Sequence, residues 1–131
     1  MPSQTGGANW PGGAVDPETG IMYILSKSDV GRMSMSNRPD RSDMDYINLQ
    51  LRTAPRLTVD GLPLIKPPYG QVVALDLNEG EKLWDAVHGE TPDSIRNHPA
   101  LAGLDIPRTG QAGRGGVLVC KTQIGMASGG A

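Results

Sequence analysis

An Asn-Trp pair set between two glycine clusters is the first arrangement in the sequence that suggests binding chemistry. The stretch reads GGANWPGG and places Asn9 and Trp10 between the glycines at 6–7 and 12–13. Loops that bind phosphate follow a strand and open a helix whose N-terminus faces the anion. Here the pattern after residue 13 is strand, turn, strand, and no Gly-Lys-Ser/Thr follows. A phosphate loop is therefore excluded, and spacing alone favours an Asn that bonds its own backbone in a glycine-rich turn.

The two histidines and the methionines are the other candidate ligands. The spacing of His88 and His98 is not that of a helix or hairpin ligand pair, and no partner cysteine or paired carboxylates accompany them. We therefore expect structural roles in loops for both. Met33, Met35 and Met44 share one segment, and thioethers would suit a soft ion such as copper(I). Their irregular, highly polar surroundings argue against such a site.

Size and composition limit what the chain can build and bind. The 131 residues include 18 glycines, 11 prolines and no phenylalanine, so we expect one domain or less with a small core. A net charge of −2 without a basic run argues against nucleic acid as a partner. No apolar stretch approaches the roughly 20 residues of a membrane span, and residues 1–3 show no signal pattern. The single cysteine, Cys120, lies in an apolar run and is expected to be buried in a strand.

The elements that must position these residues are mostly short strands bounded by turn residues. The expected strands are residues 13–16, 21–26, 46–51, 57–64, 72–77, 81–87, 116–120 and 124–128. Residues 27–45 and 108–116 are expected as loops. The segment TPDSIRNHPAL predicts a helix of about two turns, with Thr91 as N-cap, Pro92 in the first helical position and Pro99 as its limit.

A repeat links two of the expected hairpins. Ala-x-Asp-x-x-x-Gly occurs at residues 14–20 and again at 74–80, and the second copy adds Trp84 four positions after its glycine. In a tight hairpin the Ala fits where strands crowd, the Asp bonds turn amides, and the Gly takes a positive φ. Asp16 and Asp76 are therefore expected as turn residues rather than as acid–base groups.

The longer form of this repeat resembles the tryptophan docking motif of eight-bladed quinoprotein dehydrogenase propellers. In that family the tryptophan of each blade packs against the next blade. Glu79 departs from the family's usual threonine before the glycine, whereas the first copy keeps Thr19 but has Ile24 in place of the tryptophan.

Four further stretches extend the resemblance over most of residues 5–130. GGANWPGGAVDPETG, GLPLIKPPYG, HGETPDSIRNHPAL and PRTGQAGRGGVLV together resemble the C-terminal part of membrane-type quinoprotein glucose dehydrogenases and related PQQ-dependent polyol dehydrogenases. The likeness is weakest over residues 27–60. It implies an all-β fold, a fragment of about one and a half blades of an eight-bladed quinoprotein β-propeller.

On this resemblance residues 1–131 are a partial propeller domain. Residues 13–88 would form one blade with a long insertion at 27–66, and residues 113–131 would start the next blade. Propellers close with about 4–8 blades. We therefore expect the remaining blades to belong to a longer enzyme and the 131-residue piece alone to be inactive.

The resemblance also implies a cofactor site. In the family, GGANW lies at the end of the central funnel that holds PQQ, so Asn9 would hydrogen-bond the cofactor and Trp10 would line the pocket or pack beneath it. Arg114 stands where some members carry the tryptophan of a Trp-Gly-Gly sequence. It would pair with a cofactor carboxylate, although a solvated loop arginine is the simpler interpretation. The Ca²⁺ ligands and the catalytic Asp of the family belong to earlier blades, so no catalytic residue and no metal ligand is assigned in this chain.

The implied activity is the PQQ-dependent oxidation of a sugar or polyol, glucose first, with ubiquinone as electron acceptor. The implied location is the periplasmic side of a bacterial inner membrane. The alternative is a non-catalytic propeller scaffold that binds a protein, but such a scaffold would need only the repeats and neither GGANW nor IRNHPAL. A free-standing small β-domain is disfavoured because the edges of a blade leave backbone groups unpaired.

Overall fold

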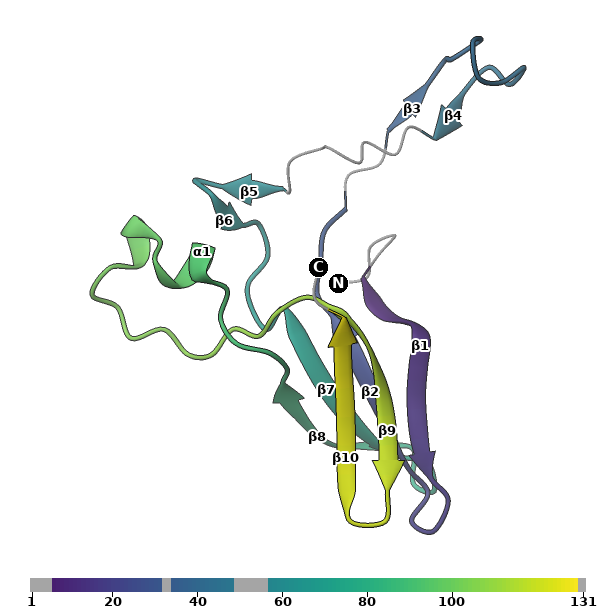
Figure 1. The fold of residues 1–131 in the computed structure, drawn as a ribbon, viewed down its shortest axis with the longest axis vertical. Helices are drawn as coiled ribbons and strands as arrows, with labels where there is room; N and C mark the ends of the chain where they lie inside the picture. Colours follow the sequence, from purple (N-terminus) through teal and green to yellow (C-terminus); the bar gives the residue numbers. More distant parts are fainter. Residues whose placement is uncertain (1–5, 32–33, 49–56, 130–131) are drawn as a thin grey trace.

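A computed structural model describes residues 6–31, 34–48 and 57–129 of the chain. Nearly all the regular structure in these ranges is β-strand, as Figure 1 shows, so the all-β fold is confirmed. Among the described residues, no helix has the length and apolarity required to span a membrane.

The main sheet has four antiparallel strands in the order β1-β2-β7-β8. They are β1 (Gly7–Asp16), β2 (Ile21–Lys27), β7 (Gly70–Asp76) and β8 (Glu81–Val87). The central pair β2–β7 is in continuous register along its whole length. Tight turns join β1 to β2 and β7 to β8, and a long excursion joins β2 to β7. A four-stranded antiparallel sheet of this kind is the form of one propeller blade.

The first turn is built around the carboxylate of Asp16. The amide of Glu18 donates to Asp16 Oδ1 at 2.9 Å, and the hydroxyl of Thr19 donates to Asp16 Oδ2 at 2.8 Å. These two hydrogen bonds, the one from Thr19 first, lower the pKa of Asp16 below its ordinary value of 3.8. Gly20 then takes a φ of 72°, which reverses the chain into β2.

The second turn repeats this geometry and is joined to the first. The amide of Asn78 donates to Asp76 Oδ1 at 2.8 Å, and Gly80 takes a φ of 73°. The side-chain amide of Asn78 also donates to the carbonyl of Thr19 at 3.0 Å, so the two turns lie side by side. The turn roles expected for both aspartates of the repeat are confirmed.

A row of four paired residues crosses the sheet at the level of the repeat. Ala14 pairs with Tyr23, Tyr23 with Ala74, and Ala74 with Trp84. Directly opposed residues of antiparallel strands share a face, so both rings flank the small Ala74, which is 0% exposed. The ring centroids of Tyr23 and Trp84 lie 5.9 Å apart. Trp84 remains 40% exposed, which leaves surface for a neighbouring element.

A second hairpin packs across the first two strands of the sheet. It consists of β9 (Arg114–Cys120) and β10 (Gln123–Gly129), and β9 lies against β1 and β2 (Figure 1). Exposure alternates along β9, so Val117 and Val119 are half-buried while Leu118 and Cys120 are exposed. The expected burial of Cys120 is therefore wrong, because the strand period places it on the outer face of the hairpin.

The connecting segments hold only short elements. These are β3 (Met35–Ser36), β4 (Ile47–Asn48), β5 (Thr58–Val59), β6 (Leu62–Pro63), α1 (Asp93–Arg96) and a 3-10 turn at Pro99–Leu101. The strands expected at 46–51 and 57–64 are thus reduced to two-residue pieces, and residues 49–51 lie outside the described ranges.

The helix in the second excursion differs from the expectation in its start and its length. The N-cap residue of α1 is Pro92 and no side chain caps the helix. Thr91 instead accepts a hydrogen bond from the amide of Thr109 at 3.0 Å, so its hydroxyl belongs to a loop contact. The helix ends at Arg96 and so holds one turn rather than about two.

The buried apolar core of the described residues is small. It consists of Leu25, Tyr69, Val72, Ala74 and Ile95, and no large side chain among the described residues is fully buried. Exposed large side chains include Val15, Trp84 and Leu118. A blade-like sheet with one further hairpin and apolar outer surfaces is consistent with a piece of a propeller, in which neighbouring blades cover such surfaces. The blade boundaries expected from the sequence remain predictions.

Candidate functional site

The beginnings of β1 and β9 lie at the same end of the sheet. The two strands contact each other and run in the same direction, as Figure 1 shows. Of the expected cofactor residues, Asn9 and Trp10 fall near the start of β1, and Arg114 is the first residue of β9. The structure therefore brings the backbone segments that carry all three residues to one end of the sheet.

Strand β1 is irregular where it carries Asn9 and Trp10. Pairing with β2 runs from Ala8↔Ser26 directly to Gly13↔Ile24, so residues 9–12 stand opposite the single residue Leu25. Such a bulge removes backbone from the ladder, and bulges are frequent next to binding sites. Pro11 needs no ladder partner, and Gly12 has a φ of 65°. The segment is a bulged strand and not the glycine-rich turn that spacing alone favoured, and the side chains of residues 9–11 lie outside the description.

Arg114 offers an uncommitted positive charge at this end. Its side chain is exposed, and its guanidinium forms no ion pair or hydrogen bond with any residue in the described ranges. A Cβ placed on the nearby Gly116 would meet no atom within 4 Å, so the space beside this residue is open. Residues 114–116 were expected in a loop, but they belong to β9 because they pair with residues 127–129 of β10. This arrangement suits a planar or extended anion that lies along the strand ends.

Three glycines let three backbone segments cross closely beside this end of the sheet. A Cβ on Gly110 would lie 2.7 Å from the carbonyl oxygens of both Gly70 and His88. A Cβ on Gly70 would clash with the carbonyl oxygen of Gln111. Gly89 and Gly110 also have φ values of 82° and 69°. We call Gly70, Gly89 and Gly110 the glycine junction; no other residue fits such close approach.

Backbone hydrogen bonds hold the junction together. The amide of Tyr69 donates to the carbonyl of Thr109 at 2.8 Å, and the amide of His88 donates to Gly70 at 2.9 Å. The amide of Gln111 donates to the carbonyl of His88, also at 2.9 Å. The chain that leaves β8 is therefore returned to the sheet and directed into β9, where Arg114 follows. The sequence contains these glycines, but their shared crossing was not anticipated, because it joins segments far apart in the chain.

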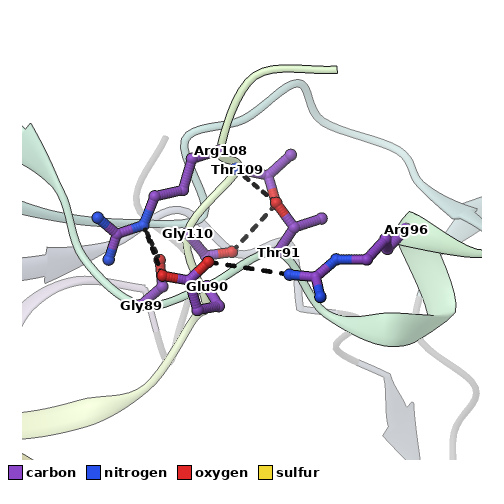
Figure 2. Close-up of polar contacts among 7 residues, drawn as sticks. All are labelled: Gly89, Glu90, Thr91, Arg96, Arg108, Thr109 and Gly110. Carbon is purple, nitrogen blue, oxygen red and sulfur yellow. Dashed lines mark hydrogen bonds and ion pairs between the residues drawn. The ribbon is translucent and has the colours of Figure 1, made fainter. Parts of the chain in front are cut away.

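Polar side chains fasten the loop that spans the junction, as Figure 2 shows. Glu90 lies 3.8 Å from Arg96 Nη2 and 3.3 Å from Arg108 Nε. Arg108 Nε also donates to the carbonyl of Gly89 at 2.8 Å. The ion pairs are exposed and contribute little stability. Their geometric effect is to close the loop base, so Arg96 and Arg108 are committed to Glu90 while Arg114 is not.

His98 has a structural role, as expected. Its Nδ1 accepts from the amide of Ala100 at 3.2 Å, so Nε2 carries the proton and donates to the carbonyl of Asp60 at 2.7 Å. This contact ties the β5–β6 hairpin to the segment after α1. Within the described ranges, no group of three His, Cys, Asp or Glu side chains is placed to hold a metal ion.

The four-stranded sheet and the hairpin packed on it are the kind of structure that one part of a β-propeller has. The comparison with family models is specific: residues 1–130 match the PQQ family model described as glucose/ethanol/alcohol dehydrogenase, beta-propeller domain. The chain belongs to this family. Neither the comparison with curated proteins nor that with solved structures gave a match.

The residues at the strand beginnings fit the cofactor that this family implies. PQQ is a planar quinone that carries carboxylates, and the uncommitted guanidinium of Arg114 beside open glycine backbone is suited to such a group. On the adjacent strand β1, the bulge at residues 9–12 provides backbone that is not paired with β2. The individual contacts assigned to Asn9, Trp10 and Arg114 stay predictions.

Proposed function

We propose that the chain forms part of the propeller of a PQQ-dependent dehydrogenase of the membrane-type glucose/polyol class. The observation that carries this proposal is the family match over residues 1–130. The likeness of GGANW and of the 88–101 excursion to that class supports the narrower assignment. On this proposal the enzyme oxidises a sugar or polyol and delivers the electrons to ubiquinone at the periplasmic side of a bacterial inner membrane.

The chain's own residues bind and orient the cofactor in this scheme. PQQ, when bound, supplies the two-electron redox chemistry, and the protein positions it. Arg114 pairs with a carboxylate at the start of β9, Asn9 hydrogen-bonds the cofactor from the bulge of β1, and Trp10 packs against the pocket. The Ca²⁺ ion implied by the resemblance is expected to be held by residues of other blades, so no ligand is assigned here.

The 131-residue piece alone is expected to be inactive. Its described strands form one four-stranded sheet and three two-stranded sheets, whereas a propeller needs about 4–8 blades to enclose a central funnel. Strand β1 and hairpin β9–β10 would form only part of the funnel wall. The proposed activity therefore belongs to a parent enzyme that supplies the other blades.

Activity of the parent enzyme tests this proposal. The apoenzyme is incubated with PQQ and Ca²⁺, and reduction of an artificial dye is followed with glucose, a set of polyols and ethanol. PQQ-dependent turnover of glucose or a polyol supports the proposal. Turnover of ethanol alone would overturn the narrower class, and dye reduction that ignores PQQ would overturn the dehydrogenase function and favour the scaffold alternative.

A further inference from the structure

A pocket of about 180 Å³ lies beside the glycine junction. It is enclosed by residues 28–30 after β2, the β5–β6 hairpin with the segment to Tyr69, the start of α1, and residues 111–112. Residue 112, which ends the last of these segments, lies two positions before Arg114 in the sequence. None of the cofactor contacts proposed above uses this pocket.

Tyr69 gives the pocket a hydroxyl that is available to a ligand. Its side chain lines the pocket and is only 9% exposed, yet its hydroxyl forms no hydrogen bond with any residue that the structure describes. Burial raises the pKa of Tyr69, so the hydroxyl keeps its proton at neutral pH and can donate it. No buried side-chain oxygen or nitrogen of the described residues lacks a partner, so this hydroxyl reaches solvent and is free to donate to an acceptor atom of a bound molecule.

The other walls limit the chemistry of such a molecule. The described lining is mixed: Val30, Leu57, Pro63, Leu64, Ile65 and Ile95 are apolar, and Ser28, Thr58, Ser94 and Gln111 are polar but uncharged. Among the described residues that line the pocket, Asp29 is the one charged side chain, and Lys27 lies 3.6 Å from it in an ion pair. The described lining thus offers no cation to an anion, and its one carboxylate is already engaged. The lining therefore favours an uncharged ligand with apolar faces and an acceptor edge.

The volume limits the ligand to one ring. Pockets for drug-sized molecules span roughly 300–1,000 Å³, and 180 Å³ is well below that range. A single six-membered ring with small substituents suits the space better than a nucleotide or a fused cofactor. A ring carbonyl could accept a hydrogen bond from the hydroxyl of Tyr69.

We propose that this pocket binds the ring of a quinone, with a ring carbonyl accepting a hydrogen bond from Tyr69. This proposal rests on the proposed function in one respect, because there the quinone is the electron acceptor. Oxidation of the substrate C–OH to C=O releases two electrons and two protons, and the quinone takes up two of each to become a quinol. The pocket lies two residues from the start of β9, which carries the proposed cofactor contact, so the acceptor would stand beside the cofactor site.

Two substitutions in the parent dehydrogenase test the pocket. Tyr69→Phe removes the hydroxyl and keeps the ring, and Ser94→Trp fills the pocket from the exposed face of α1. Tyr23→Phe and Asp93→Trp are the matched controls, since neither residue lines the pocket. The probe acceptor is a short-chain ubiquinone, and a phenazine dye serves as the acceptor that bypasses the pocket.

We expect Tyr69→Phe to raise the KM for the short-chain ubiquinone about tenfold, the usual effect of one lost buried hydrogen bond. Ser94→Trp should raise it further, while the sugar KM and the dye-linked kcat of both variants should stay within about twofold of wild type. An unchanged ubiquinone KM in both variants would overturn the pocket proposal. So would a wild-type enzyme that reduces the dye with sugar but reduces no quinone, although the PQQ-dependent function would then stand.

Failure of the proposed function gives a different pattern. If PQQ supports no dye reduction, the pocket is tested by equilibrium dialysis of the short-chain ubiquinone against the same protein. Binding that weakens in Tyr69→Phe and Ser94→Trp, but not in the two controls, would support the pocket even then. Binding that is absent or equal in all variants would overturn it.

Discussion

The rings of Tyr23 and Trp84 lie 5.9 Å apart at an interplanar angle of 44°, on the two strands that flank Ala74. Ala74 is 0% exposed, and the residues paired with it on either side carry these two rings on the same face of the sheet. The small residue of the repeat is therefore required by its neighbours across the sheet as well as by its own turn. A larger side chain at this position would separate the rings.

Ala74→Leu should destabilise the blade by about 1–3 kcal/mol, the usual range for overpacking a filled site. Ala86→Leu is the matched control, because Ala86 lies on the next strand, shares the same face and is exposed. Denaturant unfolding of the parent enzyme measures the stability of both variants. Equal midpoints for the two variants would show that the contact over Ala74 does not constrain the sheet.

The first turn should lose stability in acid through Asp16. Hydrogen bonds from Thr19 and Glu18 hold the pKa of Asp16 below its ordinary 3.8, so its ionised form stabilises the folded state. This contribution is complete above about pH 4 and is lost as the pH falls through the lowered folded pKa. Asp16→Asn should therefore lower the melting temperature at pH 7, and the difference from wild type should shrink below about pH 4. A difference that does not change with pH would contradict the role of the charge.

The glycine junction should not tolerate even one methyl group. Gly110→Ala adds a Cβ 2.7 Å from two carbonyl oxygens, at a φ of 69°. Gly103→Ala is the control, because Gly103 has a φ of 78° but no atom within 4 Å of its Cβ position. Both variants bear the cost of a left-handed conformation, about 1–2 kcal/mol, and only Gly110→Ala adds the clash. A larger loss of stability for Gly110→Ala, by thermal unfolding, is the expected result, and equal losses would contradict the close crossing.

Asn9 should contribute to cofactor retention. In the parent enzyme Asn9→Ala is expected to weaken PQQ binding by about tenfold, if it removes one hydrogen bond in a desolvated site. Asn97→Ala, on the exposed segment after α1, should leave binding unchanged. The measurement is the PQQ concentration that restores half of the dye-linked activity to apoenzyme. The same half-saturating concentration in both variants would remove Asn9 from the site.

Local chemistry explains which parts of the fold were predictable from sequence. The two aspartate turns and the hairpin of β7 and β8 depend on neighbours within a few residues, so proline, glycine and alternating β-formers were sufficient signals. The resemblance predicted the family, and the match of residues 1–130 to the family model confirms it.

The missed features depend on contacts between distant segments. The bulge at residues 9–12 arises from the register of β1 against β2, which the sequence of β1 alone does not set. The hydroxyl of Thr91 was expected to cap α1, but a partner 18 residues away competes for it. The outward direction of Cys120 follows from the register of β9, because a one-residue shift would reverse its face.

A PQQ titration of Arg114→Gln most directly tests whether the beginnings of β1 and β9 hold the cofactor. Lys121→Gln removes an equal charge at the opposite end of the same hairpin and serves as the control. We predict that Arg114→Gln raises the dissociation constant of PQQ by about tenfold or more, as expected for loss of a charge-assisted hydrogen bond, while Lys121→Gln binds as wild type. Wild-type affinity in Arg114→Gln, or equal weakening in both variants, would contradict a cofactor site at this end of the sheet.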